Sequence, residues 1–178
     1  MSQLSIVVTK HDHLQGDPHA ACSLVEYGDY ECPSCGEVQP IIKGLQAHFG
    51  NQMSFVFRNF PLREIHPWAE SAALAAEFAG SRGKFWEMHD LILANQENLS
   101  ESVLNALLVK LGMTDASLQI ARSSEAAKKR IDDDFAGGIR SGVNGTPTFF
   151  LNETRYNGPK DYDSLVAVME QVLISDGD

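Results

Sequence analysis

The stretch LVEYGDYECPSCGEVQPII, residues 24–42, decides the fold. An apolar run typical of a buried strand ends in a short turn, two cysteines follow, and then a helical pattern begins. The apolar spacing predicts a helix over residues 33–49, and Pro33 suits its first turn. Cys32 and Cys35 are therefore expected where the carboxyl end of a strand meets the amino end of a helix, which is where open α/β sheets keep their functional sites.

The flanking sequence divides into strand-rich and helical parts. Strand patterns cover residues 4–9, 23–27 and 53–58, residues 11–20 resemble a loop, and a hairpin begins at residue 148 and turns near Asn152 and Glu153. A strand–helix–strand beginning requires a parallel strand pair with a helical crossover. We therefore predict an α/β fold in which residues 1–66 and 143–178 form a mixed sheet flanked by helices, and residues 67–142 form an all-helical insertion domain.

Composition narrows the classes of function. A chain of 178 residues can bury a core without a disulfide or metal to hold it together. The net charge is −10, and the basic run at 128–130 is followed by three aspartates at 132–134, so no nucleic-acid partner is expected. No apolar run is long enough to span a membrane, and the first ten residues lack the basic region of a signal peptide. The sequence as given predicts a cytoplasmic protein, or a periplasmic or other extracytoplasmic one if a native leader was removed.

The two paired cysteines predict redox chemistry. Unpaired amides and the dipole at a helix amino end stabilise a thiolate, so Cys32 is the candidate nucleophile and Cys35 the resolving thiol. Zinc is the alternative, but a closed zinc site needs four ligands, and the chain has neither a second C-x-x-C nor an H-x-x-x-H. We therefore expect no metal site. The third cysteine, Cys22, is interpreted as a small buried apolar residue.

Three segments resemble one known family. VEYGDYECPSC, HPWAESAALAAEFAGSRGKFWEMHD and GVNGTPTFFLN are similar to the active-site segment, the start of the helical insertion and the facing loop of DsbA-like thiol–disulfide oxidoreductases in the thioredoxin superfamily. The resemblance covers nearly the whole chain. It implies a thioredoxin-like fold interrupted by helices, and exchange of disulfides with protein or peptide thiols.

The resemblance also assigns roles to residues. It implies that Pro147 is cis and packs beside the cysteine pair, and that the backbone of Thr146 pairs with an extended substrate segment. Glu26 lies in an apolar strand, where burial would raise its pKa. In the family, the acidic residue at this position is thought to exchange a proton with the second thiol, here Cys35.

The dipeptide Pro33–Ser34 between the cysteines helps to set the reduction potential. The strongest oxidants of the family place a histidine there, whereas Ser34 carries no charge, so an extreme oxidant is not expected. Tyr27, Tyr30 and Trp68 are further candidates to line a substrate groove.

The resulting hypothesis is a thiol–disulfide oxidoreductase with no bound organic cofactor beyond its own Cys32–Cys35 disulfide. Oxidase, reductase and isomerase remain open, and a cytoplasmic location favours a reductase or redox relay. Glutathione or a redox partner protein are the candidates for resetting the pair. One alternative is a glutathione-dependent transferase or isomerase of the same fold, against which Cys35 counts, because such proteins tend to carry serine or a single thiol. The other is a chaperone-like or metal-binding module.

Overall fold

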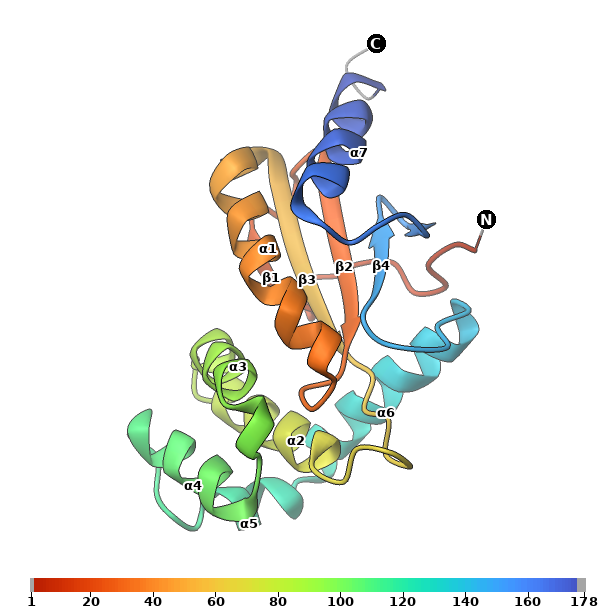
Figure 1. The fold of residues 1–178 in the computed structure, drawn as a ribbon. Coiled ribbons are helices and arrows are strands. Elements are labelled where there is room, and N and C mark those ends of the chain that lie inside the picture. Colours follow the sequence, from red (N-terminus) through yellow and green to blue (C-terminus); the bar gives the residue numbers. More distant parts are fainter. Residues whose placement is uncertain (1, 176–178) are drawn as a thin grey trace.

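The computed structural model describes residues 2–175, and a five-stranded mixed sheet forms the centre of this part of the chain (Figure 1). The strand order is β1-β3-β2-β4-β5. β2 and β3 are parallel, and the other neighbouring pairs are antiparallel. The strands are β1 (His13–Gly16), β2 (Cys22–Gly28), β3 (Met53–Asn59), β4 (Thr148–Leu151) and β5 (Thr154–Tyr156).

Helices cover both faces of the sheet, and others gather beyond the carboxyl ends of its central strands. α1 (Pro33–Phe49) and α7 (Tyr162–Ser175) lie on one face, and α6 (Glu125–Arg140) crosses the other (Figure 1). The remaining helices lie beyond the carboxyl ends of β2 and β3: α2 (Ala69–Gly80), α3 (Phe85–Ala94), α4 (Glu101–Lys110) and α5 (Ser117–Arg122). Two short 3₁₀ helices, η1 (Gly50–Gln52) and η2 (Gln96–Asn98), follow α1 and α3.

The two faces of the sheet bury separate apolar clusters. Leu24, Phe55 and Phe149 belong to the larger cluster, which α1, α7 and the helices α2–α5 complete. Val25 and Val56, one residue along on the same strands, belong to the smaller cluster, beneath α6. Because successive side chains of a strand point to opposite faces, β2 and β3 must be apolar on both, and this explains their nearly continuous apolar sequence.

The central elements match the sequence prediction closely, and the amino-terminal segment does not. The helix occupies the predicted residues 33–49, and Asn152 and Glu153 turn the β4–β5 hairpin with φ angles of 43° and 67°. The predicted strand at residues 4–9 is wrong, because two of its carbonyl groups, those of Ile6 and Val7, accept hydrogen bonds from Arg58 instead of pairing with a neighbouring strand. The edge strand is β1, inside the predicted loop at 11–20.

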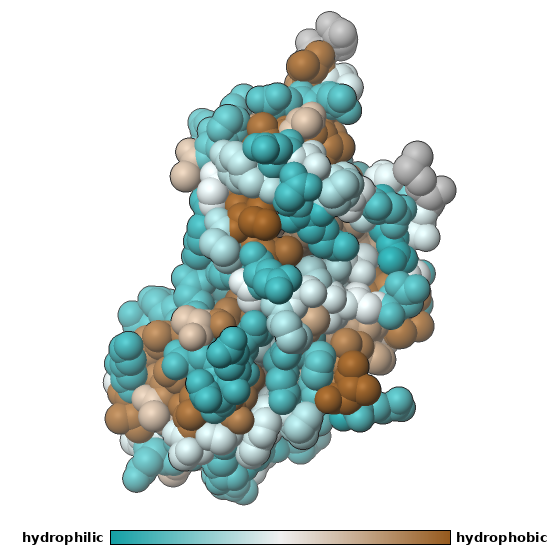
Figure 2. All heavy atoms as spheres, viewed as in Figure 1, coloured by the Kyte–Doolittle hydropathy of each residue, from teal (hydrophilic) through white to brown (hydrophobic). Residues whose placement is uncertain are grey.

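The surface in the orientation of Figure 1 is largely hydrophilic, with apolar side chains in separate patches (Figure 2). This agrees with the excess of acidic over basic residues. None of the helices described between residues 2 and 175 has both the length and the apolar character needed to cross a membrane.

Candidate active site

Cys32 lies at the junction between β2 and α1 that the sequence predicts. It is the residue before the first turn of α1, and Pro33 occupies that turn, where its missing amide proton removes no helical hydrogen bond. No acidic side chain lies in this first turn to oppose an anion. Cys32 is 8% exposed and Cys35 is 1% exposed, and both are free thiols. One sulfur therefore lies close to the surface and the other lies beneath it.

The surroundings of the two sulfur atoms separate their acidities. A hydrogen bond from the Cys35 thiol, with further ones from the amides of Cys35 and Ser34, lowers the pKa of Cys32 to about 5 in spite of its burial. Burial, followed by the interaction with Cys32, raises the pKa of Cys35 well above its ordinary value. Near neutral pH, Cys32 is thus a thiolate and Cys35 a thiol, as a nucleophile and its resolving partner require.

Glu26 lies in β2 on the same face of the sheet as the cysteine pair and is 2% exposed. Burial and, to a smaller extent, the charge of Cys32 raise the pKa of Glu26 to about 8, although a hydrogen bond with Cys35 acts in the opposite direction. The carboxylate lies beside Gly28, where a Cβ would come within 2.9 Å of its Oε1 atom. Glu26 can therefore hold or release a proton next to Cys35 near neutral pH.

The loop before β4 faces Cys32 from across the site. The Thr146–Pro147 peptide bond is cis. The Cys32 Sγ atom lies 3.4 Å from the Thr146 carbonyl oxygen and donates a hydrogen bond to it only when Cys32 is protonated. Thr148 fixes the same loop, since its hydroxyl donates to the carbonyl of Gly145 at 2.7 Å. Residues 114 positions apart in the chain are thus brought together, as the sequence comparison with DsbA-like proteins led us to expect.

Two hollows flank this loop. One is lined by α1, the loop and the two residues before α7, with mixed polar and apolar side chains: Ser34, Glu37, Val38, Ile41, Thr146, Pro147, Lys160 and Asp161. The other lies towards α6 and is mostly apolar, with Phe60, Leu62, Ile65, Phe135, Ile139 and Val143 among its lining. Of the three aromatic residues proposed for a groove, Tyr27 and Tyr30 are fully buried in the core, whereas Trp68 is only partly buried.

Every residue of the loop 29–32 is held by the segment between Leu62 and Gln96. The buried Asp29 carboxylate accepts hydrogen bonds from the Leu62 amide at 2.8 Å and contacts His66 Nδ1 at 2.8 Å. The Tyr30 hydroxyl contacts His89 at 3.0 Å, and the Glu31 carboxylate accepts from the amide of Trp68 at 2.6 Å. The sequence analysis missed these ties, because nothing in the spacing of the partners shows that they meet.

One of these ties reaches the second sulfur. The backbone amide of Asp29 donates a hydrogen bond to Cys35 Sγ at 3.4 Å, and this contact favours the Cys35 thiolate against the effect of burial. Asp29 therefore positions the turn through its side chain and Cys35 through its backbone. Across residues 2–175, no group of three or more His, Cys, Asp or Glu side chains is placed to hold a metal ion.

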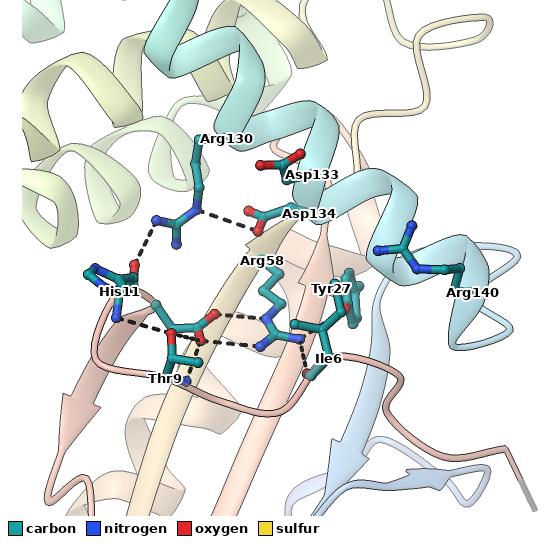
Figure 3. Close-up of a pocket in the computed structure, with 10 residues that line it drawn as sticks. Ile6, Thr9, His11, Tyr27, Arg58, Arg130, Asp133, Asp134 and Arg140 are labelled. Atoms are coloured by element: carbon teal, nitrogen blue, oxygen red, sulfur yellow. Dashed lines mark hydrogen bonds and ion pairs between the residues drawn. The ribbon is translucent and has the colours of Figure 1, made fainter.

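Charged side chains also gather on the opposite face of the sheet, beneath α6 (Figure 3). Arg58 is 3% exposed and donates to both carboxylate oxygens of Asp12, at 2.8 and 3.2 Å, and to the Tyr27 hydroxyl at 3.0 Å. Arg130 of α6 lies at the rim and donates to the carbonyl of His11 at 2.6 Å. This cluster contains no thiol and lies across the sheet from Cys32, so it belongs to the architecture rather than to the redox site.

Comparison with known proteins agrees with this geometry. A protein-family model described as Thioredoxin matches residues 8–171. The crystal structure of oxidised BdbD from Bacillus subtilis has a TM-score of 0.83 and 24% sequence identity, covering 97% of this chain and 96% of BdbD. The crystal structure of α-DsbA1 from Wolbachia pipientis has a TM-score of 0.82 and 16% identity, covering 94% of this chain and 93% of that one.

Curated relatives are similar over part of their length. A protein of Salinispora arenicola named Na(+)/H(+) antiporter NhaA 1 is 40% identical over 158 residues, which are 89% of this chain and 24% of that relative. The chain spans about a quarter of the length of the curated relatives it matches. The similarity concerns that quarter alone.

Proposed function

This chain belongs to the thioredoxin family, and we propose that it is a DsbA-like thiol–disulfide oxidoreductase that exchanges disulfides with protein or peptide thiols. The observation that supports this most strongly is the contrast between its two sulfur atoms. Cys32, near the surface, has a pKa lowered to about 5, and Cys35, beneath it, has a raised pKa and lies beside a carboxyl group that titrates near neutral pH. In such a pair, the sulfur near the surface can form a mixed disulfide with a substrate first, and the sulfur beneath it can then resolve it.

The exchange runs through Cys32 in both directions. When the pair is oxidised, a substrate thiolate attacks the Cys32 sulfur, the Cys32–Cys35 bond breaks, and Cys35 leaves. A second substrate thiolate then attacks the substrate sulfur of the mixed disulfide and releases Cys32 as a thiolate. Two electrons pass from the substrate to the pair, one proton ends on Cys35, and the other goes to solvent. When the pair is reduced, the same steps in reverse reduce a substrate disulfide.

Two features favour oxidation of substrate thiols. A leaving thiol departs faster when its pKa is low, and Cys32 has the lowered pKa. The other leaving group, Cys35, departs into a buried site, where a protonated Glu26 can supply the proton that it needs. The proposed direction therefore differs from the reductase or redox relay that a cytoplasmic location would favour. Because Ser34 adds no positive charge beside Cys32, we do not extend the proposal to an extreme oxidant.

Thr146 and Pro147 are the proposed substrate-binding residues. The Thr146 carbonyl lies beside Cys32 Sγ, so a peptide whose cysteine is joined to Cys32 can align its backbone along the same loop. The hollows on either side would take the neighbouring side chains of the peptide. Glutathione or a protein thiol remain the proposed partners that reset the pair.

Trapping experiments test the function. Cys32→Ser should abolish exchange with a disulfide-bonded peptide, and Cys35→Ser should accumulate a mixed disulfide at Cys32 that survives acid quenching and is released by reductant. Cys22→Ala, which removes a thiol remote from the pair, is the matched control and should behave as the parent. The parent protein could fail to oxidise any thiol substrate and to reduce any disulfide substrate, while Cys32→Ser still prevents aggregation of an unfolded protein. In that case the chaperone-like alternative replaces the proposal.

The redox equilibrium of the pair gives the direction. Incubation in a series of glutathione buffers, followed by alkylation of the free thiols, measures the fraction oxidised. An oxidant loses its disulfide in buffers that still contain much oxidised glutathione. A disulfide that persists in mostly reduced glutathione would instead identify a reductase.

A further inference from the structure

Gln96, in the short helix η2, reaches the active-site turn from the helical region. Its side-chain nitrogen Nε2 donates one hydrogen bond to the Tyr30 carbonyl at 3.1 Å and another to the Cys32 carbonyl at 3.0 Å. These two carbonyls belong to two of the last three residues before α1. A single amide group therefore fixes the distance between the end of the turn and the nucleophilic cysteine.

Gly36 makes room for this amide. A Cβ at Gly36 would lie 1.9 Å from Gln96 Oε1 and 2.7 Å from its Cδ atom, far inside van der Waals contact. Glycine is a poor residue for a helix, yet it stands in the first turns of α1 where the amide docks. The two residues thus form a matched pair, in which any side chain at position 36 would displace the amide of residue 96.

The contact bears on the groups that stabilise the Cys32 thiolate. The Cys32 carbonyl that Gln96 holds also accepts from the Cys35 amide at 3.0 Å. The amides of Cys35 and Ser34 are among the donors that lower the pKa of Cys32. Movement of the Cys32 backbone would lengthen those contacts, and hydrogen-bond donors lose effect steeply with distance and angle. In addition, the positive end of the Gln96 amide partly neutralises the carbonyl dipole next to the sulfur.

We propose that Gln96 is a positioning residue for the redox reaction: it docks over Gly36, holds the carbonyls of Tyr30 and Cys32, and thereby keeps Cys32 reactive. The helical region, which carries Gln96, then sets the reactivity of the cysteine that the sheet and α1 present. This inference rests on the proposed function, since it concerns the thiol that starts the exchange.

The test is a pH titration of the Cys32 thiolate by its ultraviolet absorbance, together with the rate at which Cys32 is alkylated. Gln96→Ala should raise the Cys32 pKa by about half a unit or more and slow alkylation at a pH below the new pKa. Gly36→Ala should do the same by displacing the amide. Asn98→Ala, an exposed amide in the same short helix, is the matched control and should leave the titration unchanged.

A double variant shows whether the two residues act through one contact. Gly36→Ala should lower the Tm of the parent, because it displaces the Gln96 amide and breaks its hydrogen bonds to the Tyr30 and Cys32 carbonyls. In the Gln96→Ala background the clash is gone, so the same substitution should raise the Tm, as alanine does in a helix. It should also cause no further change in the Cys32 pKa. Independent, additive effects would overturn the proposed docking.

The outcomes separate this inference from the proposed function. If Gln96→Ala lowers the Tm but leaves a low Cys32 pKa unchanged, Gln96 is only a structural tie and the inference fails alone. If the pKa shifts as expected but the parent exchanges disulfides with no thiol substrate, the positioning role stands and the proposed function fails. If the parent itself shows an ordinary thiol pKa, both fail.

Discussion

Glu26 and Arg58 lie on neighbouring strands of one sheet, both almost fully buried, and the two faces of the sheet treat their charges differently. Arg58 donates to both oxygens of the Asp12 carboxylate, to the Tyr27 hydroxyl and to the carbonyl of Ile6 (Figure 3). It also donates to the carbonyl of Val7. Every nitrogen of its guanidinium group has a partner, so the charge stays fixed.

Glu26 receives no such compensation. Among the described residues it forms no ion pair, and its hydrogen bond is to the Cys35 thiol. Burial therefore destabilises the ionised carboxylate and raises the pKa of Glu26 to about 8, so the group gains or loses a proton near neutral pH. The comparison shows how one sheet can support both roles: a satisfied buried charge holds the structure, and an unsatisfied one beside a thiol can take part in chemistry.

Removing the paired charge of Arg58 should have the largest effect on the free energy of unfolding. Arg58→Met leaves the Asp12 carboxylate buried without its partner, and removal of one member of a buried pair costs about 3–5 kcal/mol of unfolding free energy. Urea unfolding measures this loss, and the Cys32 titration of the folded protein should stay at its parent value. Arg63→Met, at a partly exposed ion pair, is the control and should cost less than about 1 kcal/mol. A comparable cost at both positions would show that the Arg58 network contributes little.

Removing the charge of Glu26 should instead increase the free energy of unfolding. The pKa of Glu26 rises from 4.5 in the unfolded chain to about 8 in the folded one, so the folded state binds the proton more tightly. Its contribution to stability is full below pH 4.5 and is lost as the pH rises through 8. Glu26→Gln avoids that loss and should make the reduced protein more stable at pH 9, by on the order of 3 kcal/mol.

The same substitution should also slow exchange, because glutamine can neither give a proton to Cys35 nor take one from it. We expect a loss of about a hundredfold in the step that involves Cys35, measured as the rate of mixed-disulfide resolution against pH. A stability gain without a change in that pH profile would mean that Glu26 is only a buried acid and not a proton donor.

The two charges also differ in how far sequence could predict them. Glu26 stands in an apolar strand six residues before Cys32, so its burial and raised pKa follow from local pattern. The helix over residues 33–49 and the hairpin at Asn152 follow in the same way, since their periodicity and turn residues act over a few positions.

Contacts between distant residues left no such signal. The Arg58 network needs carbonyls of an irregular segment that sequence pattern assigned to a strand. Gln96 lies 64 positions from Cys32, in a polar stretch that gives no indication of where its amide points. Likewise, the partners of Asp29 and Glu31 become visible only once the helical region is folded against the turn. Local rules therefore predict the elements and the thiols, whereas tertiary packing determines how the thiols are held.

Asp134, in α6, tests whether the distinction between satisfied and unsatisfied charges is one of degree, and it should give the smallest effect. It lies on the face of Arg58, where it accepts hydrogen bonds from the amide and the side chain of Asn59 at 3.0 and 3.1 Å, but its arginine partner, Arg130, is 3.5 Å away. Burial outweighs these contacts and raises the pKa of Asp134 from 3.8 to about 6, with the nearby Glu77 adding to the rise.

The folded state therefore binds the Asp134 proton more tightly than the unfolded chain does, so its contribution to stability is full below pH 3.8 and is lost as the pH rises through 6. Asp134→Asn keeps an oxygen that can accept from Asn59 and loses the charge. Relative to the parent, this variant should gain about 1–2 kcal/mol of unfolding free energy between pH 4 and pH 7. Asp133→Asn, its exposed neighbour on the helix, should show no such gain. The difference in unfolding free energy between Asp134→Asn and the parent could instead stay constant from pH 4 to pH 7. That result would mean that Arg130 neutralises Asp134 as fully as Arg58 neutralises Asp12, and that every buried charge on this face of the sheet is satisfied.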